Sequence, residues 1–201
     1  MSKAGRTRLL ALARRRGVFT AADVRRAAVH SQHVTRLLAE GVVERLARGQ
    51  YRLVDRPITE HHALVVASRA VPHGVICLLS ALSFHGIGTQ LPPEVWVAIE
   101  RRARKPKVPQ LPLAVVRFSG DAFTEGIETH RVESAGVRVY SVAKTLADLF
   151  KYRNKMGLDV ALEALQDAWR ERRFTIDELD RAARACRVER VMRPYVEAVL
   201  S

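Results

Sequence analysis

The stretch TAADVRRAAVHSQHVTRLLAEGVVERLARGQYRLV, residues 20–54, decides the fold of the N-terminal part of the chain. Thr20 is a strong N-cap for a helix over 21–28, and Ser31 is placed to cap a second helix that runs through Glu40. Apolar residues recur at helical spacing in this second helix, which predicts one buried and one polar face. The buried stripe is Val34, Leu37 and Leu38, and Gly41 ends the helix.

A β-hairpin is predicted directly after the second helix. Residues 42–46 and 51–54 have the composition of short strands, and 47–50 form a tight turn in which Gly49 takes a positive φ. Upstream, a helix over 2–16 ends at Gly17. Three helices followed by a basic hairpin are the layout of a winged helix-turn-helix, which we predict over residues 1–56.

The polar face of the second helix and the tip of the hairpin are the predicted DNA contacts. Long donors on such a helix reach base edges, and a small hydroxyl suits a phosphate or a thymine methyl group. A small helical domain that contacts proteins, with solvated arginines, is the alternative for this segment. The predicted DNA-binding residues are Thr20, Ser31, Gln32, His33, Thr35, Arg36, Arg48, Gly49 and Gln50.

The charge of the chain is concentrated at its N-terminal end. The 201 residues carry 34 Lys and Arg against 21 Asp and Glu, and residues 1–56 alone hold 13 against 4. The segment thus has a net charge of +9 of the total +13, which favours a polyanionic partner. A GC-rich host explains a preference for Arg over Lys, but it does not explain the concentration at one end.

Residues 57–201 are predicted to form an α+β domain, joined to the winged helix by a short linker at 55–57. A helix over 60–71 follows Thr59 as N-cap, and Ser80 caps another over 81–85. A small, mostly antiparallel sheet is expected from strands over 95–100, 115–118, 127–133 and 137–140. A C-terminal helical bundle is expected from helices over 142–152, 158–172, 176–186 and 188–200. Ser141 is the expected N-cap of the first of these helices, and Thr175 and Glu178 have the spacing of a capping box at the third.

The loop 101–107, RRARKPK, carries five positive charges between the first two strands. It is either a solvated hairpin loop or a second contact with nucleic acid or an acidic protein surface.

No catalytic residue, metal site or cofactor is predicted. Ser80 and His85 lack a third group that would orient them, and capping explains them better. Lys144 and Asp148, at i and i+4, are expected to form a salt bridge worth a few tenths of a kcal/mol. An enzyme acting on nucleic acid remains the alternative, and it requires Glu100, Glu133 and Asp148 to converge at one metal site.

The two cysteines, Cys77 and Cys186, are expected to be small buried residues in a reducing compartment, although a bridge between them stays open. The apolar run over 9–13 is too short for the core of a signal peptide, and no stretch approaches a membrane span. We therefore expect a cytoplasmic protein without a membrane partner.

Three segments in this order resemble the AbiEi family of antitoxins from type IV toxin–antitoxin systems. They are LLAEGVVERLARGQYRL (37–53), CLLSALSFHGIGTQLPPEVWVAI (77–99) and GVRVYSVAKTLADLFKYRNKMGLDVALEAL (136–165), and the likeness spans about residues 5–200. The resemblance implies a repressor that binds inverted repeats in its own promoter, with two copies on the double-stranded DNA. It further implies that the C-terminal domain neutralises a nucleotidyltransferase toxin.

Overall fold

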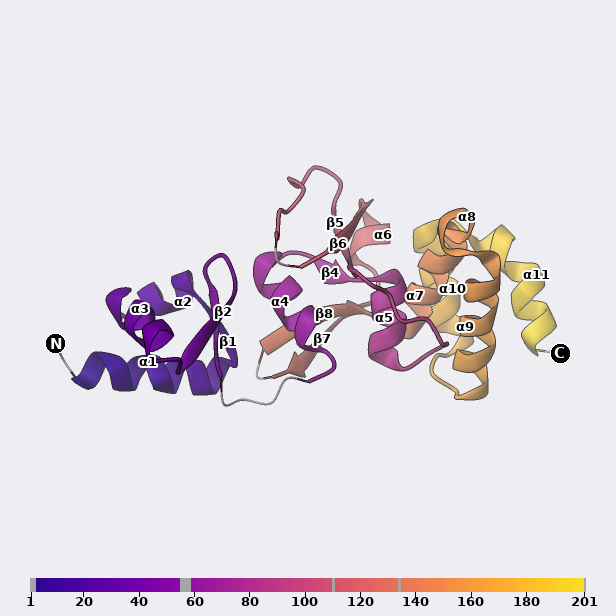
Figure 1. Cartoon of the computed structure of the whole chain (residues 1–201). Helices are drawn as coiled ribbons and strands as arrows, with labels where there is room; N and C mark the ends of the chain where they lie inside the picture. The colour runs from indigo at the N-terminus through magenta and orange to yellow at the C-terminus, as the bar shows by residue number, and fades with distance from the viewer. Residues whose placement is uncertain (1–2, 55–58, 110, 134, 201) are drawn as a thin grey trace. The chain divides into compact units, whose positions relative to one another are not determined.

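The computed structural model describes residues 3–54, 59–109, 111–133 and 135–200. They form a mixed α and β fold in which N-terminal helices are followed by two sheets and by C-terminal helices (Figure 1). This confirms the predicted fold class. Two compact units are distinguished: residues 1–73 with 106–112 and 130–137, and residues 74–105 with 113–129 and 138–201. The predicted linker and domain boundary fall at 55–58, outside the described residues.

The N-terminal module begins with helix α1 (Lys3–Arg16), strand β1 (Val18–Thr20), and helices α2 (Ala21–Arg26) and α3 (Gln32–Ala39). The hairpin of β2 (Val43–Ala47) and β3 (Gln50–Leu53) follows, and the three strands form an antiparallel sheet in the order β1-β3-β2. Their shared core is built from buried residues of each helix and of β1, among them Leu9, Phe19, Val24 and Leu37. The predicted winged-helix order is confirmed, with β1 as an unpredicted third strand.

A five-stranded sheet has the order β6-β5-β4-β8-β7. Its strands are β4 (Val75–Ile76), β5 (Val95–Glu100), β6 (Leu113–Phe118), β7 (Ile127–Val132) and β8 (Ala135–Tyr140). Strand β4 pairs antiparallel with β5, but β5 pairs parallel with β6 and β4 pairs parallel with β8. The expectation of a mostly antiparallel sheet was therefore wrong.

The loop after β5 explains this error. A parallel neighbour requires a crossover of about a dozen residues or more, whereas an antiparallel neighbour needs only a short hairpin. The segment that carries RRARKPK returns the chain to the start of β6 beside β5, so it is a crossover and not a hairpin loop.

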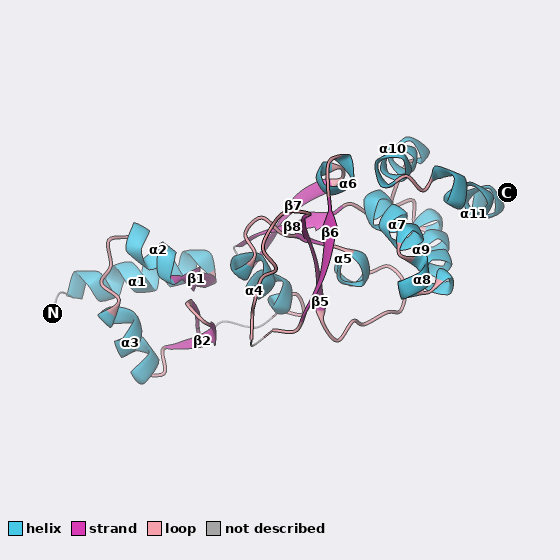
Figure 2. Ribbon diagram, turned by 90° about the horizontal axis from the view of Figure 1, so that it is seen from above, coloured by secondary structure: helices cyan, strands magenta, loops and turns pink. Residues whose placement is uncertain are grey.

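The C-terminal helices form the predicted bundle (Figure 2). Helix α5 (Leu78–His85) packs on β5 and α7 (Val142–Lys151), and α7 in turn packs on α9 (Leu158–Arg170) and α10 (Ile176–Cys186). Helix α11 (Glu189–Leu200) packs on α9 and α10. The remaining helices are α4 (His62–Ala70), α6 (Asp121–Thr124) and α8 (Arg153–Met156). No helix among the described residues has the length and apolar character to cross a membrane.

Local capping determines several of these boundaries. Ser141 accepts from the amide of Lys144, and Thr175 forms a reciprocal capping box with Glu178, both as predicted. Two other predicted caps were wrong because their side chains bind distant partners. Thr59 donates through its amide and hydroxyl to Glu133, and Ser80 lies inside α5, where its hydroxyl accepts from the amide of Trp96.

Candidate nucleic-acid interface

Helix α2 is anchored at its N-terminus by Thr20 and Asp23. The Thr20 hydroxyl accepts from the Asp23 amide at 3.1 Å, while Asp23 Oδ2 accepts from the Thr20 amide at 2.9 Å and from its hydroxyl at 3.0 Å. The Asp23 side chain is 4% exposed and also lies 3.5 Å from Arg16 Nη1. Thr20 therefore forms the predicted N-cap, and its hydroxyl group is used in these hydrogen bonds with Asp23.

Electrostatics keep Asp23 ionised despite its burial. Burial alone would raise the pKa of this carboxyl, but the hydrogen bonds from Thr20 and the positive charges of Arg16 and Arg69 outweigh it, so the pKa is lowered from 3.8. The carboxylate contacts Arg16 at the end of α1, Thr20 at the start of α2 and Arg69 on α4. These contacts fix the position of α2, which precedes α3.

Helix α3 presents a polar outer face. Gln32, Thr35 and Arg36 are exposed, whereas Val34 and Leu37 are buried in the core of the module. Arg36 is 60% exposed and forms an ion pair along the helix with Glu40, at 3.2 Å from Nε to Oε1. Glu40 also pairs with Arg6 of α1. Three of the residues predicted from the sequence are thus brought together on one accessible surface.

Two predicted contacts next to this face behave differently. Ser31 occupies the N-cap position and is exposed, but its side chain makes no capping hydrogen bond, so the predicted cap at α3 is absent. His33 is half-buried against α1, since a Cβ placed on Gly5 would lie 2.3 Å from its Nε2. The small size of Gly5 therefore lets the His33 ring pack under α1 and away from the open face.

The hairpin tip, Arg48 and Gly49, lies between β2 and β3. Gly49 has the predicted positive φ, +75°, and its carbonyl accepts from the amide of Ala21 at 3.0 Å. This bond ties the tip to the first residue of α2, while the Arg48 side chain stays exposed. The position of the tip relative to α2 is therefore fixed by this hydrogen bond.

Gln50 was predicted to contact DNA, and the structure corrects this. Its side chain is 4% exposed and faces α4, where its amide lies 3.3 Å from the carbonyl of Val66 and 3.2 Å from the amide of Ala70. A residue used to hold α4 against the hairpin cannot reach a duplex. Sequence alone gave no sign of α4 on this side of β3.

A small cleft beside the hairpin tip includes Lys107, a residue of the loop 101–107 for which the sequence allowed two interpretations. It has a volume of about 310 Å³ and lies between the tip, α4 and the segment 107–109. Its cationic side chains are Arg48, Arg69 and Lys107. Lys107, from the basic loop, is exposed and therefore adds positive charge beside the tip.

The carboxylates required by the enzyme alternative are each held by separate partners. Glu100 accepts from the amide of Arg102, Glu133 accepts from Thr59 and lies 2.8 Å from His62 Nδ1, and Asp148 is paired with Lys144. Within the described ranges no group of three or more His, Cys, Asp or Glu side chains could hold a metal ion. His85 Nε2 lies 2.8 Å from the carbonyl oxygen of Tyr140, whereas the Ser80 hydroxyl accepts from the amide of Trp96. The two side chains thus have different hydrogen-bond partners.

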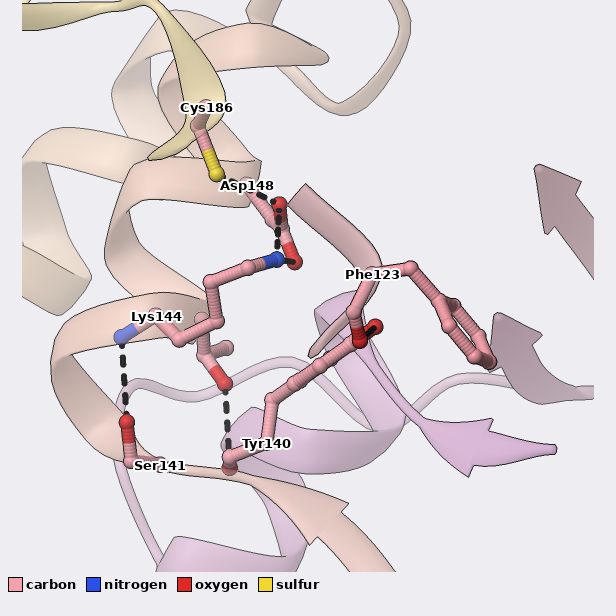
Figure 3. Close-up of polar contacts among 7 residues, drawn as sticks. Phe123, Tyr140, Ser141, Lys144, Asp148 and Cys186 are labelled. Atoms are coloured by element: carbon pink, nitrogen blue, oxygen red, sulfur yellow. Dashed lines mark hydrogen bonds and ion pairs between the residues drawn. The ribbon is translucent and has the colours of Figure 1, made fainter. Parts of the chain in front are cut away.

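Both cysteines are free and buried. Burial raises the pKa of the Cys186 thiol to about 12, and its Sγ donates to Asp148 Oδ1 at 3.2 Å (Figure 3). A protonated thiol with this bond has a structural role and is a poor nucleophile.

Three helices and a basic hairpin on one core define a winged helix-turn-helix, the class of DNA-binding transcriptional regulators. Residues 8–54 match the family model described as transcriptional regulator, AbiEi antitoxin. The predicted resemblance to this family is thus confirmed over residues 8–54, which contain all but a small part of the winged helix-turn-helix and include the first of the three motifs.

The whole fold is also found in a solved structure. The RV2827C protein from Mycobacterium tuberculosis has a TM-score of 0.64 to this chain at 13% sequence identity, over 98% of this chain and 76% of that one. No curated protein matches the chain.

Proposed function

We propose that this protein is a transcriptional repressor that binds an inverted-repeat operator in its own promoter through α3 and the hairpin tip. The observation that carries the proposal is the exposed face of Gln32, Thr35 and Arg36 on a module with a net charge of +9. Arg48 and Lys107 supply phosphate contacts beside that face, and Ser31 adds a hydroxyl at its start. An inverted repeat requires two copies of the chain on the duplex. Because the operator is part of the chromosome, we propose that the protein acts in the cytoplasm.

The test is binding of the full chain to its own promoter fragment. We expect a footprint with two-fold symmetry and an affinity at least about a thousandfold above that for a scrambled duplex of equal length at the same salt concentration. Equal affinity for both duplexes would contradict operator recognition.

The second part of the proposal is that residues 57–201 neutralise a nucleotidyltransferase toxin. The description of the matched family as an antitoxin supports it. Co-expression with a nucleotidyltransferase toxin tests it: the full chain should restore growth, and a variant deficient in operator binding should restore growth equally. Failure of the intact chain to restore growth would remove this part and leave the repressor role standing.

A further inference from the structure

The second unit contains a basic cleft that the proposed operator contact does not use. It has a volume of about 840 Å³ and opens between the ends of β5 and β6, α6, α7 and α10. Six cationic side chains line it together with two carboxylates, Asp121 and Glu125. The cations are Arg101, Arg117, Lys151, Arg181, Arg184 and Arg187.

The topology of the sheet supports a ligand at this place. Strands β5 and β6 are parallel, with Glu100 opposite Phe118 at their carboxyl ends, and the cleft begins with the residues that follow those ends. In open α/β sheets, ligands commonly bind in the crevice outside the carboxyl ends of parallel strands.

The cations of this basic cleft outnumber its carboxylates, six against two, and three of them form no ion pair within the described residues. Arg184 lies 3.7 Å from Glu189, but within the part of the chain that the structure describes no carboxylate forms an ion pair with Arg101, Arg181 or Arg187. Arg117 is held in place because its Nη1 donates to the carbonyls of Arg101 and Ala103, both at 2.7 Å. Like charges gathered in a concave site raise the local positive potential, and a bound anion lowers it.

The lining also indicates which anion fits. Its aromatic residue, Phe118, is 3% exposed and Ala122 is 9% exposed, so the cleft offers no apolar anchor of the kind that protein partners use. The same burial leaves no ring on which a nucleobase could stack. Planar guanidinium groups recognise phosphate through paired, charge-assisted hydrogen bonds. We propose that this basic cleft binds the linked phosphates of a polyphosphate group or of a nucleic-acid backbone.

Titration calorimetry of the full chain with sodium tripolyphosphate tests the proposal, at constant ionic strength. The cleft variant Arg101→Glu/Arg181→Glu changes two exposed residues that line the cleft, one directly after β5 and one on α10. The control Arg190→Glu/Arg193→Glu makes the same change in charge on the exposed face of α11. We expect saturable binding of one tripolyphosphate per chain, weakened at least about tenfold in the cleft variant and retained in the control.

Two further probes separate the sources of the anion. If the cleft variant loses binding of tripolyphosphate but keeps binding of a single-stranded oligothymidylate, the ligand of the cleft is a free polyphosphate. If it loses binding of both probes, the ligand is a nucleic-acid backbone. Equal losses in both variants, no saturable binding, or equally tight binding of polyglutamate would overturn the proposal. If the cleft variant fails to fold, Arg101→Gln/Arg181→Gln replaces it with the same expected loss. Operator binding is measured separately, so its outcome does not decide this test.

Discussion

Lys144 and Asp148 form an ion pair one turn apart on α7, with 2.6 Å between Nζ and Oδ2, and both side chains are 0% exposed. The ammonium group also lies 4.0 Å from the ring centroid of Tyr140 and 4.6 Å from that of Phe118. The pair was expected from its spacing, with a value of a few tenths of a kcal/mol, which is that of a pair on the surface of a helix. Full burial changes this value, because a buried charge whose partner is removed has no water to solvate it.

Replacing Lys144 by Met should therefore lower the free energy of unfolding by about 3–5 kcal/mol. The double variant Lys144→Met/Asp148→Leu should recover most of this loss, since it removes both charges from the core. Urea unfolding followed by circular dichroism measures both effects. The exposed pair Arg170–Asp167 is the control, where Arg170→Met should cost less than about 1 kcal/mol. A loss for Lys144→Met as small as that of the control would contradict the burial of the pair.

The same variant should show a characteristic dependence on pH. Burial raises the pKa of Asp148 above 3.8, and the charge of Lys144 opposes this. A raised pKa in the folded chain means that the carboxyl stabilises the fold below 3.8 and that this stability is lost as the pH rises through the folded value. Lys144→Met removes the opposing charge, so the pKa of Asp148 rises further in the variant, which then loses more stability than the unchanged chain as the pH rises. The deficit of Lys144→Met should therefore be smallest below pH 3.8 and grow towards neutral pH. A deficit independent of pH would indicate lost packing alone.

Asp23 should show the opposite dependence, because its pKa is lowered in the folded chain. Its stabilising contribution is present above 3.8 and is lost as the pH falls through the folded value. We expect Asp23→Asn to cost about 1–2 kcal/mol at pH 7, with the difference from the unchanged chain closing in acid. Unfolding midpoints at several pH values test this, with the exposed Glu197→Gln as control. A constant cost at all pH values would show that the charge of Asp23 does not matter.

Features that depend on neighbours in sequence were predicted well. The caps at Thr20, Ser141 and Thr175 need only an amide three residues ahead, and the turn at Gly49 needs only its own φ. The cap at Ser31 is the local exception, since its side chain makes no capping hydrogen bond. The other failures involve partners far along the chain. Thr59 binds Glu133, Ser80 binds Trp96, and Gln50 faces α4. The parallel β5–β6 pair likewise depends on the path of a long crossover, which alternating residues do not specify.

Arg48 should contribute to DNA binding without discriminating between sequences. Its side chain is exposed at the hairpin tip, where a guanidinium group meets phosphates. Arg48→Ala should weaken operator and scrambled duplex to a similar extent and reduce the slope of log affinity against log salt by about one. Fluorescence anisotropy over a salt series measures the slope, and Arg190→Ala on α11 is the control. An unchanged slope would remove the hairpin tip from the interface.

Gln32 and Gln50 provide a matched test of sequence reading, because they are the same residue type in opposite environments. Gln32 is exposed at the start of α3, and an exposed amide there can form paired hydrogen bonds with an adenine edge, whereas Gln50 is 4% exposed. Gln32→Ala should weaken operator binding by about 1–3 kcal/mol and leave binding to scrambled duplex unchanged. Gln50→Ala should instead lower the unfolding midpoint, because it removes a side chain packed against α4, and should preserve the ratio of the two affinities. Competition binding with both duplexes, together with thermal unfolding, separates these outcomes. Equal losses of affinity for both duplexes in Gln32→Ala would show that Gln32 contacts phosphates and not bases. Other residues of the module would then recognise the operator sequence.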